Sequence, residues 1–360
     1  MRPKGLYIHV PFCVRKCPYC DFYSVTELSL TEAYAKAVIR NIKAQNIYAD
    51  TVYFGGGTPS LLDADQIYEI LSAVKLTENA EVTMECNPNT VTKKYLNEIK
   101  KAGVNRISFG IQSLNDNELA ALGRIHNSET AEKAVYDAYD AGFCNISADI
   151  MLATAYQTKY SLDETLKKLI KLPLTHVSAY MLKIEPDTPY GRNDKLPTLL
   201  PDDDEVADMY LQTVEALEKA GFMQYEISNF AKEGFQSRHN LKYWHCEEYY
   251  GIGPSAHSYV NGVRKACSKS VQDFINAPVQ QETVTENEGG DSEERTMLAL
   301  RLTREGINLS NLTAERRNEI MKTALPMVKA GLMRQKENSL MLTAKGCLVS
   351  NEIICRLLMC

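Results

Sequence analysis

The chain has 360 residues, which is enough for one large domain with a small one beside it. It carries 40 Lys and Arg residues against 46 Asp and Glu residues, and the net charge of −6 argues against charge-driven binding to nucleic acid or anionic membranes. Hydrophobic residues at 44% and charged residues at 24% are typical of a soluble globular protein and exclude disordered and collagen-like chains.

Neither a signal peptide nor a membrane span is predicted. The N-terminus has no apolar stretch of signal-peptide length, and no later run approaches the roughly 20 apolar residues of a transmembrane helix. We therefore expect a cytoplasmic protein.

The ten cysteines are distributed unevenly. Cys13, Cys17 and Cys20 fall within eight residues, whereas the others are scattered singly. Clustered thiols in a reducing compartment more often bind metal, and scattered ones such as Cys86 and Cys144 are usually small buried hydrophobes.

Strand-like and helix-like segments alternate six times in the first half of the chain. The strand-like segments are 6–10, 51–54, 81–85, 106–111, 145–151 and 176–182. The helix-like segments include 31–46, 92–102, 128–141 and 162–172. Regular alternation predicts an α/β fold with parallel strands and right-handed crossovers. By itself it allows either an open doubly wound sheet or a full or partial barrel.

Residue types at the helix ends support these assignments. Gly103 and Gly142 come just after helical segments, where glycine favours a left-handed C-terminal cap. Thr92 and Ser128 stand at the expected N-caps. The acidic run 202–205 is predicted to open a further helix, with its carboxylates at the positive end of the helix dipole.

The C-terminal region is predicted to be a separate module. A polar stretch from 280 to 294, which contains Gly289 and Gly290, predicts a linker. Helical patterns follow it, together with a short β-like run at 339–343 and a last helix that ends near Met359. These patterns predict a small α+β module.

The strongest chemical signal is the sequence Cys13-Val-Arg-Lys-Cys17-Pro-Tyr-Cys20, directly after the first strand-like segment. Three thiolates at this spacing can hold three corners of a cubane iron–sulfur cluster and leave the fourth iron open to a substrate. The alternative is structural zinc with His9 as the fourth ligand. The cluster is favoured, because His9 lies within the strand pattern and zinc sites usually pair their ligands as two separated knuckles.

With the following Asp21-Phe22, this sequence resembles the signature of radical S-adenosylmethionine (SAM) proteins. The resemblance implies a 4Fe–4S cluster whose open iron chelates the amino and carboxylate groups of SAM. It also implies that an electron from the reduced cluster cleaves a carbon–sulfur bond and gives a 5′-deoxyadenosyl radical. The superfamily has a partial (β/α)6 barrel with the cluster loop after the first strand, in agreement with the six βα units.

Further motifs resemble the oxygen-independent coproporphyrinogen III oxidase group. They are Tyr7-Ile-His-Val-Pro-Phe-Cys13, Tyr53-Phe-Gly-Gly-Gly-Thr-Pro-Ser-Leu61, Glu85-Cys-Asn-Pro88, Ser108-Phe-Gly-Ile-Gln-Ser113, Leu122-Gly-Arg-Ile-His126 and Tyr225-Glu-Ile-Ser-Asn-Phe-Ala231. The sequence His239-Asn-Leu-Lys-Tyr243-Trp244 is similar to the H-N-x-x-Y-W signature of the heme chaperone branch, HemW. True oxidases of the group extend further before the first strand and carry a fourth cysteine where this chain has Phe22, so both differences favour the heme chaperone branch.

The resemblance covers nearly the whole chain and implies three parts. Residues 1–200 are expected to form the radical SAM partial barrel, 201–285 a family-specific extension with the H-N-x-x-Y-W motif, and 286–360 a small α+β, winged-helix-like domain.

A glycine triplet marks the end of the second strand-like segment. Gly55, Gly56 and Gly57 let the backbone approach a ligand closely, although a tight turn alone would also use them. Barrel enzymes place their sites at the carboxyl ends of strands. The resemblance assigns Gly56, Gly57 and Thr58 to the methionine part of SAM.

Polar residues end three successive strands. Glu85, Gln112 and Asp149 could each be a satisfied structural polar residue, but together they favour a ligand site. The resemblance assigns SAM contacts to Tyr7, Glu85, Gln112, Arg124 and Asp149. Residues 153–157 depart from the glycine-proline turn that relatives usually have after this Asp, and Ser255 stands where glycine is common.

His239 and His245 flank a tryptophan, and three tyrosines lie within the same dozen residues. Such a patch suits a porphyrin with an axial nitrogen ligand. A packed aromatic core with a hydrogen-bonded histidine is the alternative. The resemblance makes His239 the preferred heme ligand. The remaining histidines have no comparable sequence setting: His9, His126, His176 and His257.

These features predict a heme chaperone-like radical SAM protein that binds a 4Fe–4S cluster, SAM and heme. Its expected partners are heme or another porphyrin, a heme-acceptor protein and an electron donor for the cluster, with no nucleic acid. The alternatives are an oxygen-independent coproporphyrinogen III oxidase, another porphyrin-modifying enzyme or a radical SAM methyltransferase. Whether the chain is an enzyme stays open, since its core has the residues for SAM cleavage while Phe22 and the short N-terminus argue against a true coproporphyrinogen III dehydrogenase.

Overall fold

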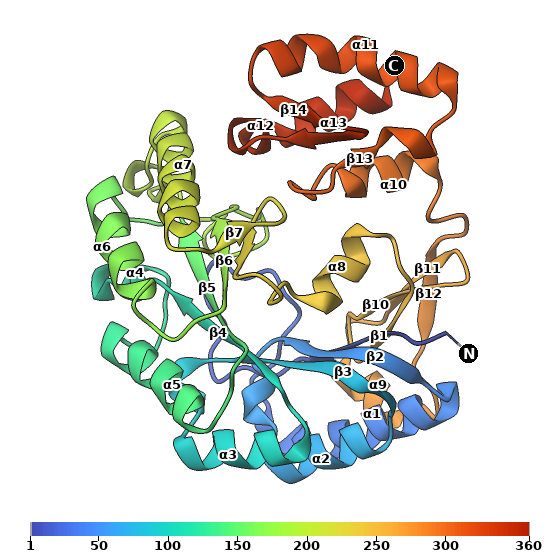
Figure 1. Cartoon of the computed structure of the whole chain (residues 1–360). Coiled ribbons are helices and arrows are strands. Elements are labelled where there is room, and N and C mark those ends of the chain that lie inside the picture. The colour runs from blue at the N-terminus through green and yellow to red at the C-terminus, as the bar shows by residue number, and fades with distance from the viewer. Residues whose placement is uncertain (1, 360) are drawn as a thin grey trace.

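A computed structural model describes residues 2–359. Its centre is a curved sheet of six parallel strands with helices on the outer side (Figure 1). The strands are β1 (Lys4–Val10), β2 (Tyr48–Gly56), β3 (Lys75–Cys86), β4 (Arg106–Gln112), β5 (Ile146–Leu152) and β6 (His176–Met181). The helices between them are α1 (Thr31–Gln45), α2 (Ala64–Ser72), α3 (Lys93–Ala102), α4 (Asp116–Ala121), α5 (Ser128–Asp140) and α6 (Lys159–Leu169).

Shorter strands extend this sheet at both edges. On one side β9 (Tyr249–Ile252) pairs parallel with β1 and is followed by β10 (His257–Val260), β11 (Val263–Cys267) and β12 (Glu282–Glu286). On the other side β8 (Asn229–Ala231) pairs antiparallel with β6 and is followed by β7 (Met223–Gln224). Because β7 and β12 are the unpaired ends of the sheet, it forms an open, partial barrel.

Three further helices belong to this part of the chain. They are α7 (Asp203–Lys219), α8 (Arg238–Trp244) and α9 (Val271–Asn276). Helix α8 lies on the inner, concave side of the sheet, whereas α7 and α9 pack outside it (Figure 1).

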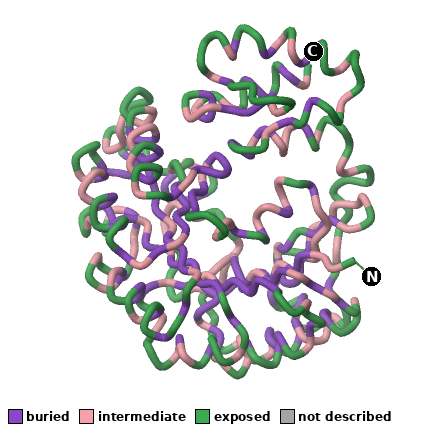
Figure 2. The backbone as a smooth tube through the Cα atoms, in the orientation of Figure 1, coloured by how far each residue is buried: buried purple, intermediate pink, exposed green. Residues whose placement is uncertain are grey.

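The parallel strands alternate between an apolar outer face and a polar inner face. On the outer face, side chains such as Leu6, Ile8 and Phe54 are fully buried in the hydrophobic core beneath the helices. Figure 2 shows this burial along the strands of the sheet. The inner face carries hydroxyls, imidazoles and charges, including Thr51, Tyr53, Thr83, Glu85, Arg106, Ser108, Ser147, Asp149, His176 and Ser178. Because successive side chains of a strand point to opposite faces, this alternation directs the polar groups into the barrel.

The C-terminal elements lie across the open side of the barrel (Figure 1). They are α10 (Ser292–Ala299), β13 (Ile307–Asn308), α11 (Ala314–Lys329), β14 (Met333–Lys336), β15 (Ser339–Leu342), α12 (Ala344–Leu348) and α13 (Ser350–Leu358). The three strands form an antiparallel sheet in the order β13-β15-β14, which confirms a small α+β module. Thr303 Oγ1 donates a hydrogen bond to the carbonyl oxygen of Gln224 at 3.0 Å, and the Arg301 guanidinium lies 4.4 Å above the Trp244 ring. The module thus contacts the edge strand β7 and helix α8 inside the barrel.

Several cap predictions are confirmed. Thr92 caps α3 by accepting a hydrogen bond from the Tyr95 amide, and Gly103 and Gly142 adopt positive φ angles of 115° and 86°. Asp202 caps α7 in a capping box with Glu205.

Three expectations were wrong. Asn127, one residue before Ser128, caps α5, because its side chain accepts the Thr130 amide. Cys144 is exposed rather than buried. The stretch 280–294 is not a continuous linker: Gln280 is buried, and β12 pairs with β11 as an edge strand. The domain boundary near 285–286 stays a prediction. In the described part of the chain, no helix is long and apolar enough to cross a membrane.

Helix α8 is held inside the barrel by a buried carboxylate. Glu81 of β3 accepts hydrogen bonds from the backbone amides of Arg238 and His239, at 3.2 and 3.1 Å. At the other end of the helix, Lys242 Nζ lies 3.0 Å from Asp50 Oδ2. The position of α8 therefore depends on charges that β2 and β3 place on the inner face.

We predict that Glu81→Ala lowers the free energy of unfolding by about 2–3 kcal/mol. The change removes two hydrogen bonds to a charged group and leaves the buried His239 amide without a partner. Chemical denaturation of the variant and the wild type measures this difference. The matched control is Glu78→Ala on the exposed part of the same strand, which we expect to change the value by less than about 0.5 kcal/mol. Equal stabilities of the two variants would contradict this role of Glu81.

Candidate functional site

A cavity of about 460 Å³ opens at the carboxyl ends of the parallel strands. We call it the strand-end cavity. The cluster loop, the segment after β2 and the ends of β3 to β6 form its wall. Ten residues predicted from the sequence line it: Cys13, Cys17, Cys20, Gly56, Gly57, Thr58, Glu85, Gln112, Arg124 and Asp149.

The three cysteines present free, half-buried thiols to this cavity. Thr58 Oγ1 donates to Cys13 Sγ and Arg124 Nη1 to Cys17 Sγ, both at 3.6 Å. Burial raises the pKa of the Cys20 thiol to about 11, and the other two cysteines add to the shift. A bound metal reverses such a shift, because thiols bind metals as thiolates.

This donor set fits the cluster predicted from the sequence. In a four-iron cluster each thiolate binds a different iron, so the ligands need not converge on one point as those of a zinc ion do. Among the described residues, no three Cys, His, Asp or Glu side chains form a group that could hold a single metal ion. Cys13, Cys17 and Cys20 are therefore the residues that would hold the cluster.

The glycine triplet lets the β2 end approach the cluster loop. Gly56 has φ +104°, and a Cβ there would lie 2.5 Å from His9 Cε1. A Cβ on Gly57 would lie 2.7 Å from the Phe12 carbonyl oxygen. The Thr58 amide donates to the same oxygen at 2.7 Å. A side chain at Gly57 would push the start of the cluster loop away from the strand, and one at Gly56 would clash with the His9 ring of β1.

Two half-buried carboxylates lie on the inner wall. Glu85 accepts hydrogen bonds from Tyr53 Oη at 2.8 Å and from the Gly56 amide at 3.2 Å. Asp149 accepts one from Ser108 Oγ at 3.1 Å. Burial, with a smaller contribution from the neighbouring Asp149, raises the pKa of Glu85 to about 7. Burial also raises the pKa of Asp149. A cationic ligand such as the ammonium of SAM would stabilise both ionised forms.

Gln112 and Arg124 reach the cavity through local backbone features. The β4–β5 register shifts between Gly110 and Gln112, and Gln112 has φ +67°, which is rare for a residue with a side chain. Arg124 Nη2 donates to the Gly110 carbonyl oxygen at 2.9 Å. Its buried Nε has no hydrogen-bond partner among the residues described, so the guanidinium keeps a donor for a ligand carboxylate.

The loop after β5 departs from the glycine-proline pattern but still directs Asp149 into the cavity. Ala153 and Tyr156 take positive φ angles of 60° and 65°. The Gln157 side chain accepts a hydrogen bond from the Ala153 amide at 2.7 Å and donates one to the Met151 carbonyl at 3.1 Å. These two hydrogen bonds of Gln157 therefore stabilise a loop conformation in a segment where relatives use glycine.

Tyr7 is the one predicted SAM contact that does not line the strand-end cavity. Its hydroxyl is hydrogen-bonded to His9 Nδ1 at 3.1 Å, and its ring lines a second cavity of about 460 Å³. We call this the aromatic cavity. It lies between β1, α8, β9, β10 and α10.

Sequence reasoning missed Asn87 and Tyr180, which both line the strand-end cavity. Asn87 Nδ2 donates to Thr58 Oγ1 at 2.9 Å, and Arg124 donates to its Oδ1. Asn87 directly follows β3, and Tyr180 lies at the end of β6. The strand-end rule that selected Glu85 could have found both.

His239 is fully buried on the inner face of the barrel. Its Nδ1 is hydrogen-bonded to Thr51 Oγ1 at 2.8 Å and its Nε2 to Tyr243 Oη at 2.9 Å, while its ring stacks on Tyr53. Burial lowers its pKa to about 3, so the imidazole is neutral. This is the setting of a hydrogen-bonded core histidine, and iron ligation would require one of the two bonds to break.

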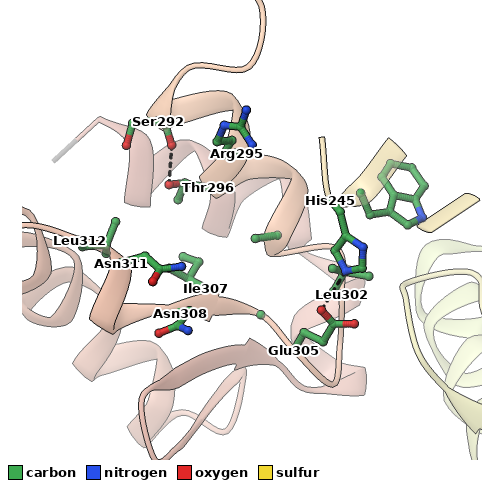
Figure 3. A pocket seen from close by; sticks show the side chains of 13 residues that line it. His245, Ser292, Arg295, Thr296, Leu302, Glu305, Ile307, Asn308, Asn311 and Leu312 are labelled. Atoms are coloured by element: carbon green, nitrogen blue, oxygen red, sulfur yellow. Dashed lines mark hydrogen bonds and ion pairs between the residues drawn. The ribbon is translucent and has the colours of Figure 1, made fainter. Parts of the chain in front are cut away.

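His245 lies at a third cavity of about 450 Å³, between α8 and the C-terminal module. We call it the C-terminal cavity. His245 Nε2 pairs with Glu305 Oε2 at 2.8 Å (Figure 3). This hydrogen bond raises the pKa of His245. The two histidines of the motif region are thus both engaged with protein groups.

We predict that the cluster depends on the three cysteines of the loop. Anaerobically reconstituted protein should hold about four iron and four sulfide, and Cys13→Ala, Cys17→Ala or Cys20→Ala should lose them because each removes one iron ligand. Iron and labile-sulfide analysis measures this. Cys144→Ala, at an exposed cysteine, is the control. One zinc ion without labile sulfide in the purified protein would refute the prediction.

We predict that SAM affinity rises with pH between about 5.5 and 7. Glu85 is largely protonated below its pKa of about 7, and a cation favours the ionised form, so binding releases a proton. The dissociation constant should fall by up to about tenfold per pH unit. Calorimetry on reconstituted protein measures it. Glu85→Gln, which should retain the iron of the cluster, should bind SAM more weakly, and its SAM affinity should no longer depend on pH in this range. An unchanged pH dependence in that variant would assign the released proton to another group.

Known proteins match this chain over most of its length. Residues 7–169 match the Radical SAM superfamily. The chain is 33% identical to the heme chaperone HemW of Bacillus subtilis (strain 168) over 97% of this chain and 98% of that protein. It is 39% identical to the HemW of Escherichia coli (strain K12) over 72% and 70% of the two chains. The fold matches E. coli coproporphyrinogen III oxidase, HemN, with a TM-score of 0.83 at 20% identity, over 99% of this chain and 90% of that one. The family implies a 4Fe–4S cluster and SAM, and the chain belongs to the HemW family of radical SAM proteins.

Proposed function

We propose that this protein is a heme carrier that binds heme and passes it to an acceptor protein. The observation that supports this most is the similarity to heme chaperones along nearly the full length of both chains. The likeness to coproporphyrinogen III oxidase concerns the fold and does not favour that activity. Phe22, in place of a fourth cysteine, also argues against the oxidase.

The radical SAM core has the residues to bind its cofactors. Cys13, Cys17 and Cys20 would hold the cluster, which when bound supplies the electron for cleavage of SAM. Glu85 and Asp149 supply negative charge for the cationic parts of SAM. Gln112 offers an amide, and Arg124 keeps a donor for the SAM carboxylate. An electron donor for the cluster is a further expected partner.

His239 contributes to heme binding in this proposal. As an iron ligand it would first have to release Thr51 or Tyr243. While both bonds are intact, it holds Tyr243 at the aromatic cavity, which supports binding without ligation.

We predict that the reconstituted protein binds heme and gives it up to an acceptor but does not decarboxylate coproporphyrinogen. Titration with heme should produce a saturable Soret band, and mixing with excess apomyoglobin should transfer that heme. Incubation with coproporphyrinogen, SAM and a reductant should yield no protoporphyrinogen. The control is protein without the cluster. We expect this protein to retain heme binding, because the aromatic cavity lies outside the cysteine loop. A protein that binds no heme and makes protoporphyrinogen would be an oxidase.

A further inference from the structure

We propose that heme occupies the aromatic cavity and that His257 of β10 ligates its iron. This inference rests on the proposed carrier function and assigns the place where the macrocycle binds. It is carried by three features of the structure: the lining of the cavity, the free imidazole of His257 and the cations beside it.

Aromatic rings supply much of the apolar wall that a tetrapyrrole requires, beside the charged side chains of Glu247, Arg264 and Glu294. Tyr243 and Trp244 contribute rings from α8, Tyr249 and Tyr259 contribute rings from β9 and β10, and Leu298 closes one side from α10. Tyr243 and Tyr249 meet edge to face, with ring centroids 4.6 Å apart. The two aromatic residues of the H-N-x-x-Y-W motif therefore both line this space.

His257 differs from the other histidines in having a free ring. Neither of its ring nitrogens has a hydrogen-bond or ion-pair partner in the part of the chain that the structure describes, although the side chain lines the cavity. The other five are each bonded to protein groups: His9, His126, His176, His239 and His245. A neutral imidazole that is exposed at an apolar cavity is suited to bind a heme iron.

Arg264 lines the cavity and pairs with Glu286 and Glu294, at 3.3 and 2.6 Å, so a heme propionate bound to it would replace one of these carboxylates. Partial burial lowers the pKa of His257, and the nearby charges of Lys269 and Arg264 lower it further. The lowered pKa favours the neutral imidazole. Arg264 lines the cavity with its guanidinium 4.4 Å above the Tyr259 ring. The cavity thus has aromatic walls, a free ligand nitrogen and an ion-paired arginine in one place.

The aromatic cavity also adjoins the cluster loop. Phe22, two residues after Cys20, lines both this cavity and the strand-end cavity. His9 lines the aromatic cavity and packs against Gly56 of the strand-end cavity. Heme bound here would lie next to the radical SAM site without occupying it.

The test is heme titration of the full-length, cluster-reconstituted protein, followed by absorption and resonance Raman spectra. The variants are His257→Ala and the matched control His245→Ala, whose imidazole lies at the C-terminal cavity. We expect His257→Ala to shift the Soret band and to weaken heme binding by about tenfold or more. Added free imidazole should restore the wild-type spectrum, because it can fill the space of the missing side chain. His245→Ala should match the wild type, and iron and sulfide should be unchanged in both variants.

Other outcomes separate this inference from the function on which it rests. If the wild type binds heme and His257→Ala binds it with the same affinity and spectrum, the assignment of His257 is overturned and the carrier function stands. If His245→Ala alone loses the spectrum, heme binds at the C-terminal cavity and the inference is overturned. A wild-type protein that binds no heme overturns the carrier function itself.

Discussion

The bond of His239 Nδ1 to Thr51 joins helix α8 to β2, and its Nε2 orients Tyr243 of the same helix, so the walls of the cavities depend on this histidine. Together with the contacts that Glu81 and Asp50 make to α8, the Thr51 bond places the helix against β2 and β3. Tyr243 then stands at the aromatic cavity, and Trp244 lines both that cavity and the C-terminal cavity. The Arg301 guanidinium stacks on Trp244, so the same helix also positions the C-terminal module.

The polar inner face of the barrel buries charged groups, and a ligand of opposite charge can offset the free-energy cost of burying them. Arg106 is 1% exposed in the barrel, and its Nε lacks a hydrogen-bond partner within the described residues. Its charge lowers the pKa values of Glu85 and Asp149, but burial outweighs this effect in both carboxylates. Since the two carboxylates are destabilised in their charged forms, a cation at the strand ends gains more from them than it would from exposed acids.

Much of the strand-end cavity could be predicted because it depends on local rules. Cysteine spacing, glycines after a strand and polar residues at strand ends are all visible in sequence, and parallel strands bring their carboxyl ends together. The position of Tyr7 could not be predicted in this way, since strand alternation puts it on the inner face without saying which cavity it meets. The place of His257 at the aromatic cavity could not be predicted either, because α8 and α10 approach β10 from distant parts of the chain.

Phe22 links the two cavities and gives a physical reason why this site differs from an oxidase. Its side chain is 59% exposed and lines both spaces. A fourth cysteine at this position would present a thiol to the boundary, where it could compete for iron. Phenylalanine offers a flat apolar face instead, which has no affinity for iron and packs well against a macrocycle. In the carrier that we propose, Phe22 would therefore leave the three thiolates of the loop to the cluster and the adjacent cavity to heme.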